Sequence, residues 1–154
     1  MQTAMLIGAD FEAGADEVEI VLNPANGETI LELPEASGEQ IDRAVAAAEK
    51  AFASWRRTTP GERSAALLKL ADRIEAEAGE FARLEALNCG KPYHAVLGDE
   101  IPGVVDVLRF FAGAARCQHG SAAGEYLEGF TSMIRRDPIG VVASIAPWNY
   151  PLMM

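Results

Sequence analysis

Three stretches of the chain place their apolar residues at helical spacing, and each of them predicts a helix with one apolar face. In the first, residues 37–56, that face is formed by Ile41, Val45, Ala48, Phe52 and Trp55. Ser37 followed by Gln40 has the pattern of a capping box, in which each side chain accepts a bond from the other residue's backbone N–H. The sequence therefore predicts a helix that begins directly after Ser37.

The second stretch begins with Thr-Pro-Gly-Glu at residues 59–62. This is a typical helix start, because N–H groups in the first turn have no partner within the helix and proline can therefore lack one there. Its apolar face is formed by Leu67, Leu70, Ile74, Phe81, Leu84 and Leu87. Gly79 could break or bend it, and Gly90 with a proline beyond predicts its end. A third helix is expected over residues 98–118, with an apolar face formed by Ile101, Val104, Val105, Leu108, Phe111 and Ala115.

The segments on either side of these helices have the character of strands. Residues 4–36 read as strands and turns, and Asn-Gly at residues 26–27 predicts a hairpin between residues 18–22 and 29–33, because both residue types tolerate a positive φ. Residues 126–138 would place apolar and polar side chains on both faces of a strand. They predict an exposed strand or hairpin.

Residues 140–146 form a short, nearly uncharged apolar run. Such a run predicts a strand that is buried on both faces, as in the parallel sheet of an α/β protein. The chain has no second run of this kind to pair with it. We therefore expect a sheet that is begun but not completed, and a chain that continues beyond Met154 in the whole protein.

Charge and composition narrow the classes of function. The 154 residues carry a net charge of −10, which argues against nucleic-acid binding because phosphate contacts need a basic face. No apolar run is long enough to cross a bilayer, and the first residues lack the basic start of a secretory signal, so a cytoplasmic protein is expected. The two cysteines, Cys89 and Cys117, are not part of a CxxC pair or of a cluster with metal-ligand spacing.

The predicted buried strand leads into Pro-Trp-Asn-Tyr-Pro at residues 147–151, here called the proline-bracketed loop. Ligands of α/β folds bind at the carboxyl ends of the strands, and the two prolines stiffen the backbone on either side. The amide of Asn149 could then donate to an oxygen that becomes anionic during acyl transfer, where one donor contributes about 2.7–4 kcal/mol. The alternative is that Asn149 caps a turn or a helix and that Trp148 belongs to the core.

The residues 144–152, Ser-Ile-Ala-Pro-Trp-Asn-Tyr-Pro-Leu, resemble a signature of the aldehyde dehydrogenase superfamily. Similarity continues along the chain in the family's order, at residues 23–28, 44–55, 84–92, 110–113 and 136–141. Within the family, Gly-Glu-Tyr-Leu-Glu-Gly at residues 124–129 and residues 144–154 most resemble bacterial γ-aminobutyraldehyde dehydrogenases.

This resemblance implies an α/β fold, the N-terminal part of the aldehyde dehydrogenase fold. Residues 1–122 would form a hairpin and a three-helix layer of the cofactor-binding domain. Residues 123–138 would begin an oligomerisation arm, and residues 139–154 would hold the first strand and loop of a Rossmann-like NAD-binding sheet. The whole enzyme, expected to be a homotetramer, would oxidise an aminoaldehyde such as γ-aminobutyraldehyde, in putrescine breakdown, to the carboxylate. The cofactor would be NAD, with NADP not excluded.

The resemblance also assigns roles to individual residues. Asn149 would donate its amide to the oxyanion, and the cofactor-binding residues would be Ile145, Ala146, Pro147, Trp148 and Asn149. Tyr150 would border the substrate tunnel, where a tyrosine face attracts an ammonium by about 0.5–2 kcal/mol. The alternative for Tyr150 is a packing residue.

The family's cysteine nucleophile, its glutamate base and its glycine-rich cofactor loop have no counterpart among these residues. Cys89 and Cys117 are unsuited to replace the nucleophile, because each lies near the C-terminal end of a predicted helix, where the dipole opposes a thiolate. We expect residues 1–154 alone to be inactive. Lys91, His94 and His119 are most simply surface residues, no metal site is expected, and Glu100 matches a cation-site residue of some relatives only loosely. The competing hypothesis is a short, non-catalytic module for helical binding or oligomerisation.

Overall fold

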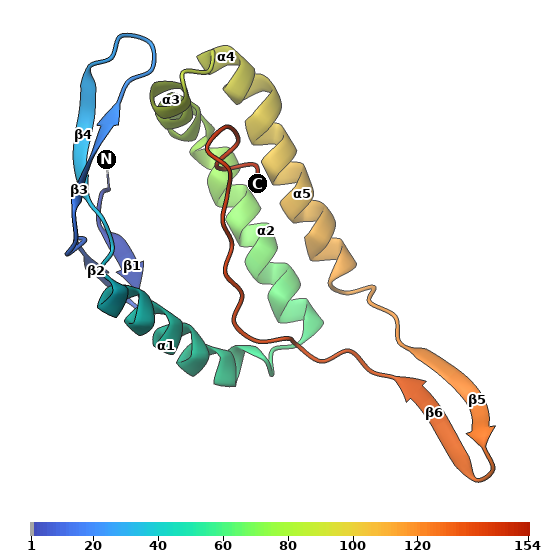
Figure 1. The fold of residues 1–154 in the computed structure, drawn as a ribbon. Helices are drawn as coiled ribbons and strands as arrows, with labels where there is room; N and C mark the ends of the chain where they lie inside the picture. Colours follow the sequence, from blue (N-terminus) through green and yellow to red (C-terminus); the bar gives the residue numbers. More distant parts are fainter. Residues whose placement is uncertain (1) are drawn as a thin grey trace.

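The computed structural model describes residues 2–154, with every side chain in that range except that of Ala123. The chain forms an α/β arrangement in which three two-stranded antiparallel hairpins flank a group of helices (Figure 1). In chain order the elements are β1 (Met5–Ile7), β2 (Asp10–Glu12), β3 (Val18–Leu22), β4 (Thr29–Pro34), α1 (Gly38–Trp55), α2 (Pro60–Ala76), α3 (Ala78–Cys89), α4 (Tyr93–Ala95), the π-helical turn η1 (Val96–Glu100), α5 (Ile101–Ala114), β5 (Ser121–Leu127) and β6 (Phe130–Ile134).

The hairpin predicted around residues 26–27 is confirmed as β3 and β4, which pair antiparallel with Val18 opposite Pro34. Its tip differs in detail from a two-residue turn. The N–H of Asn23 donates to the carbonyl of Glu28 at 2.8 Å and so closes a longer loop. Within this loop only Gly27 adopts a positive φ, of 75°, because a glycine has no Cβ to clash in the left-handed region.

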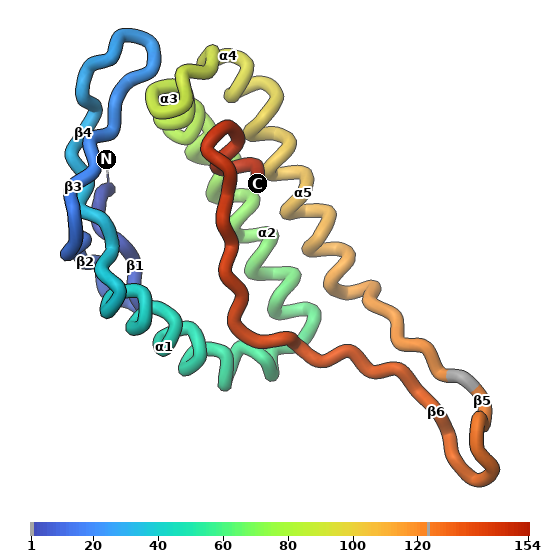
Figure 2. Tube along the Cα trace, viewed as in Figure 1, coloured from blue at the N-terminus to red at the C-terminus, as the bar shows by residue number. Residues whose placement is uncertain are grey.

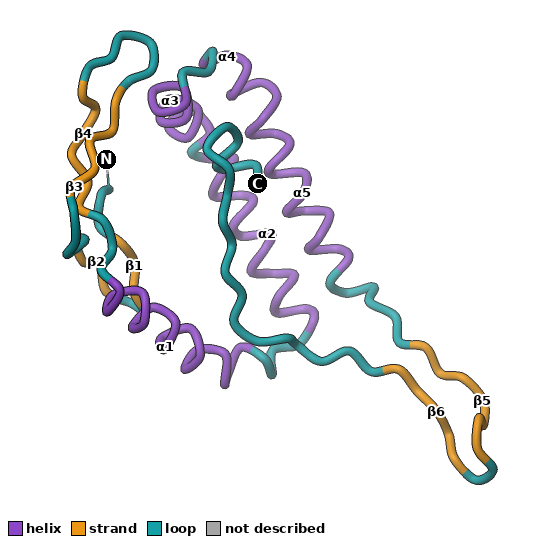
Figure 3. The backbone as a smooth tube through the Cα atoms, viewed as in Figure 1, coloured by secondary structure: helices purple, strands orange, loops and turns teal. Residues whose placement is uncertain are grey.

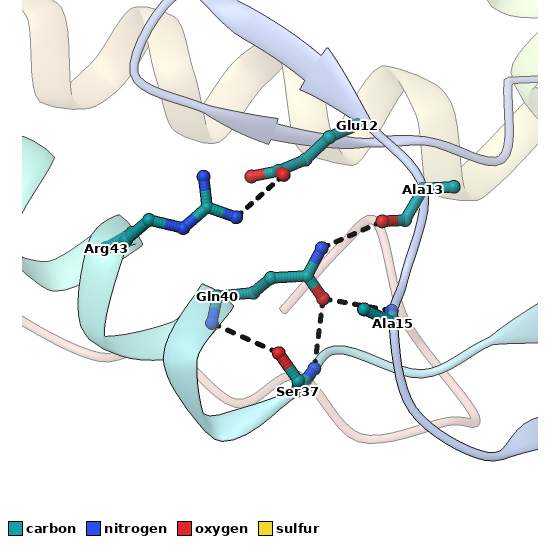
Figure 4. A network of polar contacts seen from close by, with 6 residues as sticks. All are labelled: Glu12, Ala13, Ala15, Ser37, Gln40 and Arg43. Carbon is teal, nitrogen blue, oxygen red and sulfur yellow. Dashed lines mark hydrogen bonds and ion pairs between the residues drawn. The ribbon is translucent and has the colours of Figure 1, made fainter.

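The capping box predicted for the first helix is confirmed, and it also fastens the preceding segment to α1 (Figure 4). The Gln40 side chain is buried, and its Nε2 donates to the Ala13 carbonyl at 2.8 Å. Its Oε1 accepts the N–H groups of Ala15 and Ser37, each at 3.0 Å. One side chain therefore joins the start of α1 to the chain leaving β2.

The long second helix of the sequence analysis is two helices. Glu77, with φ −106° and ψ 16°, leaves the helical region and separates α2 from α3, two residues before the suspected Gly79. The end at Gly90 is confirmed, with φ 72°. α2 and α5 lie side by side (Figures 2 and 3), and the buried cluster between the helices comprises Ala71, Ile74, Ala82, Val96, Ile101, Val104 and Val105.

The third helix begins earlier and ends earlier than residues 98–118. It starts as α4, passes through η1 and continues as α5 to Ala114. Pro102 has no N–H to donate to the carbonyl of Gly98, and the π-helical turn lies directly before this interruption. π-Helical turns are typical of places where the regular ladder is disturbed.

The strand predicted at residues 140–146 is not formed in this structure. These residues have no strand pairing and are mostly exposed, with Val142 71% exposed and Ile145 94% exposed. A parallel strand exists only through its neighbours, and the part of the chain that the structure describes contains no parallel strand. The apolar run is therefore extended but unpaired.

The overall shape is open. The β5–β6 hairpin projects away from the helices, confirming the predicted exposed hairpin, and the following segment turns back toward α3 (Figure 1). Within the described range, none of the helices combines the length and the apolarity needed to span a membrane.

Candidate active-site loop

The proline-bracketed loop is attached to helices that lie far from it in the sequence. The thiol of Cys89, the last residue of α3, donates to the backbone carbonyl of Trp148 with an Sγ–O distance of 3.3 Å. The side chain of Leu152, just after the loop, packs against the buried cluster. These contacts return the end of the chain to the junction of α3, α4 and α5.

A second attachment is made by Lys91, which the sequence analysis placed on the surface. That placement is wrong, because its side chain is only 17% exposed. Its Nζ lies 2.9 Å from Glu85 Oε1 and 2.6 Å from Glu100 Oε2, and 3.9 Å from the centre of the Tyr150 ring. We call Lys91, Glu85 and Glu100 the Lys91 cluster.

The Lys91 cluster draws its members from three parts of the fold. Glu85 lies in α3 and is 5% exposed, whereas Glu100 ends η1 and is 15% exposed. Burial alone lowers the pKa of Lys91, but the hydrogen bonds to Glu100 and Glu85 outweigh it, so this pKa is raised. Lys91 is therefore a cation at neutral pH, and two carboxylates against one ammonium leave the cluster with an excess negative charge.

The same surroundings keep the Cys89 thiol protonated. Burial raises the pKa of Cys89, and the charge of Glu85 raises it further. A reactive thiol needs the opposite environment. This environment points in the same direction as the sequence argument against Cys89 as a nucleophile, which stays a prediction.

The centre of the loop faces outward. Asn149 is exposed, and Trp148 is 82% exposed, so the alternative that Trp148 is a core residue is wrong. Tyr150 is 37% exposed and lines a hollow of about 570 Å³ together with Ala95, Asp99, Glu100, Met153 and Met154. Tyr150 thus contacts the Lys91 ammonium and borders a hollow that includes two acidic residues.

The sequence profile of the aldehyde dehydrogenase family matches residues 11–154, nearly the whole chain and including the loop. The chain belongs to the aldehyde dehydrogenase family. The attachment of the exposed Trp-Asn-Tyr turn to Cys89 and Lys91 is therefore seen in a member of this family.

Relatives and solved structures agree with this membership. An acetaldehyde dehydrogenase of Pseudomonas aeruginosa is 43% identical over 132 residues, which are 86% of this chain and 26% of that protein. A fluoroacetaldehyde dehydrogenase of Streptantibioticus cattleyicolor is 40% identical, over 96% of this chain and 29% of that protein. The chain thus spans somewhat more than a quarter of these relatives.

Among solved structures, PnpE in complex with nicotinamide adenine dinucleotide is 40% identical, with a TM-score of 0.93, over 99% of this chain and 31% of that one. A betaine aldehyde dehydrogenase from Staphylococcus aureus in complex with NAD⁺ is 32% identical, with a TM-score of 0.91, over the same shares. The N-terminal part of the aldehyde dehydrogenase fold is therefore confirmed.

This aldehyde dehydrogenase chain also has a larger cleft, of about 890 Å³, which the end of the loop reaches. Its walls come from β3 and β4 on one side and from α3 on the other, and Pro151 and Leu152 reach its edge. The lining is mostly apolar. Among the residues described, no three His, Cys, Asp or Glu side chains are grouped to hold a metal ion.

The structure brings some candidate residues together and leaves others apart. Trp148, Asn149 and Tyr150 share one turn, whereas Ile145 and Ala146 lie in the extended segment before it. Sequence reasoning missed the Lys91 cluster. A faint signal for it was Lys91 directly behind the Gly90 helix end, within reach of the acidic Glu85.

Proposed function

We propose that the whole protein is an NAD⁺-dependent aldehyde dehydrogenase, which oxidises an aldehyde to the carboxylate. The observation that carries this proposal is the exposed Asn149 between two neighbours that are each fastened to the helical layer. An exposed amide donor on a turn whose neighbouring residues are attached suits an oxygen that gains negative charge as a nucleophile attacks a carbonyl. PnpE and the betaine aldehyde dehydrogenase, both solved with NAD, support the choice of cofactor.

The residues before Asn149 fit a role beside the cofactor. Ile145 and Trp148 are 94% and 82% exposed, and the apolar residues 145–148, which lead from the extended segment into the turn, can cover part of a dinucleotide. We assign cofactor binding to Ile145, Ala146, Pro147, Trp148 and Asn149. Bound NAD⁺ would accept a hydride from the substrate; the chain's own part is to hold the carbonyl oxygen and exclude water around it.

For the substrate we propose an aldehyde with a cationic end, such as γ-aminobutyraldehyde from putrescine breakdown, as in the bacterial dehydrogenases that the sequence resembles. The Tyr150 ring already contacts one ammonium, that of Lys91, and Asp99 and Glu100 line the hollow beside it. A tyrosine ring is a group that binds cations, although Lys91 already lies against this one. The acidic side chains that line the hollow favour a further positive charge. The betaine aldehyde dehydrogenase named above acts, by its name, on an aldehyde with a permanent positive charge.

The experiment compares γ-aminobutyraldehyde with acetaldehyde as substrates of the intact gene product, by NADH formation. We expect a higher kcat/KM for the aminoaldehyde. Asn149→Ala should lower kcat about 10²- to 10³-fold, as loss of one oxyanion donor does, while Gln118→Ala, an exposed amide away from the loop, should not. A preference for acetaldehyde would remove the substrate assignment, and an unchanged kcat in Asn149→Ala would remove the activity proposal.

We further propose the division into residues 1–122, 123–138 and 139–154, with the β5–β6 hairpin as the start of an oligomerisation arm of a cytoplasmic homotetramer. Residues 1–154 alone should neither bind NAD⁺ tightly nor oxidise aldehydes, because the raised pKa of Cys89 disfavours the thiolate that a nucleophile needs. NADH formation by purified residues 1–154 would contradict this expectation.

A further inference from the structure

The two residues that flank Asn149 are held by the same three-residue segment. Cys89 bonds the carbonyl of Trp148 at 3.3 Å, and Lys91 places its Nζ 3.9 Å from the Tyr150 ring. Between them Gly90 holds a φ of 72°. Because the attachments fall on residues 148 and 150, the position and the orientation of residue 149 depend on segment 89–91.

Lys91 is itself held from two directions. Its Nζ is 2.9 Å from Glu85 and 2.6 Å from Glu100, and both carboxylates are largely buried. A lysine side chain normally keeps several rotamers. Here two ion pairs from different helical segments fix the ammonium in one place, so the face that it presents to Tyr150 is fixed as well.

Stability alone does not explain why the Lys91 cluster is buried. Buried ion pairs seldom stabilise more than apolar residues of equal size, since desolvation cancels most of their attraction. What such a cluster supplies is a definite geometry. The cluster lies against the turn that carries the exposed amide of Asn149.

We propose that Lys91, held by Glu85 and Glu100, is a positioning residue that sets the orientation of the Asn149 amide through its contact with Tyr150, with Cys89 as a second attachment at Trp148. This inference rests on the function proposed above. It assigns to Lys91 no contact with the substrate and no proton transfer. Its effect passes through the loop.

The first test is a double-mutant cycle in the intact gene product. Lys91→Met should lower kcat roughly 10- to 100-fold, as a displacement of about 1 Å does, and Lys69→Met, an exposed lysine of α2, should not. In the Asn149→Ala background, Lys91→Met should change kcat less than about twofold, because coupled residues are not additive. Lys91→Arg, which keeps the charge, should restore most of the rate.

An equal loss of kcat in both backgrounds would overturn the proposal, because a general structural role does not depend on Asn149. Should Lys91→Met fail to fold, Cys89→Ala in the same cycle removes the other attachment without leaving a buried charge unpaired. It should then show the same dependence on Asn149, and an equal loss in both backgrounds would again count against the proposal.

The second test does not need activity. Residues 1–154 contain two tryptophans, Trp55 and Trp148, so in Trp55→Phe the fluorescence reports on Trp148 alone. Lys91→Met should increase the fast component of its anisotropy decay roughly two- to threefold, as when a rigid segment becomes flexible, and Lys69→Met should leave it unchanged. An unchanged decay in Lys91→Met overturns the positioning role. A changed decay, together with an intact gene product that oxidises no aldehyde, would leave positioning intact and remove the proposed function.

Discussion

The surroundings of Cys89 favour a hydrogen-bonding thiol over a reactive thiolate. It lies at the C-terminal end of α3, where the helix dipole disfavours an anion. Burial, followed by the charge of Glu85, raises its pKa. Its bond to the Trp148 carbonyl also requires the thiol proton, because a thiolate cannot donate.

The raised pKa predicts slow alkylation of Cys89. At pH 8 in residues 1–154, iodoacetamide should modify Cys89 several-fold more slowly in the folded chain than in urea, since less thiolate is present. Peptide mass spectrometry separates it from the exposed Cys117, which serves as the internal reference. Equal rates for Cys89 before and after unfolding would contradict the prediction.

The same shift has a consequence for stability, with a definite sign. The folded state holds the thiol proton more tightly than the unfolded state, so the contribution of Cys89 is complete at neutral pH. It is lost as the pH rises through the pKa of the folded thiol. Stability should therefore fall on the alkaline side more steeply in the wild type than in Cys89→Ala.

Among the secondary-structure elements, α1 depends most on a single side chain. Gln40→Ala leaves the Ala13 carbonyl and the N–H groups of Ala15 and Ser37 without their partner. One unpaired buried group costs about 1–3 kcal/mol, but Ala13 and Ala15 are exposed, so water can replace part of the lost bonds. We therefore expect a total loss of about 1–3 kcal/mol in the free energy of unfolding by urea. Lys50→Ala, on the exposed face of α1, should change it by less than about 0.5 kcal/mol.

Two glycines offer a matched comparison of loop and helix end. Gly27 and Gly90 both have a positive φ, so alanine at either costs about 1–2 kcal/mol of backbone strain. An added Cβ meets nothing within 4 Å at Gly27 but lies 2.8 Å from Pro24 Cγ at Gly90. Gly90→Ala should therefore lower the free energy of unfolding by urea by about 1–3 kcal/mol more than Gly27→Ala does. Equal losses in the two variants would show that the β3–β4 loop is not in tight contact with the end of α3.

The same elements explain how far the sequence could be interpreted alone. Ser37, Gln40 and Gly90 were predictable because capping and left-handed ends are local chemistry. The strand at residues 140–146 was not, because pairing depends on strands elsewhere. Lys91 was missed for a related reason: its contact with Tyr150 joins segments that no periodicity connects.

At the scale of the whole molecule, the β5–β6 hairpin is the most exposed apolar element. Its exposed large residues are Tyr126, Leu127, Phe130, Met133 and Ile134. Edge strands with uncovered apolar side chains pair readily with other chains. This exposure supports the proposed role as an oligomerisation arm, and it equally suits the competing hypothesis of a binding module.

Self-association of residues 1–154 should therefore depend on this hairpin. Tyr126→Lys combined with Phe130→Lys should shift the sedimentation velocity profile toward the monomer, because it removes apolar area and adds repulsive charge. Thr131→Lys, which adds a charge on β6 without removing an apolar side chain, should shift it less. Profiles that respond to Thr131→Lys as strongly would mean that charge, and not the apolar surface, controls association.

The bond between Cys89 and the Trp148 carbonyl joins residues 59 positions apart, and this distance orders the folding of the molecule. Helices form from near neighbours, within about a microsecond, whereas closing a long loop must first overcome chain entropy. We therefore expect the individual helices to form before the proline-bracketed loop docks on them. On this argument, any role that the loop has in catalysis depends on a surface that is assembled first.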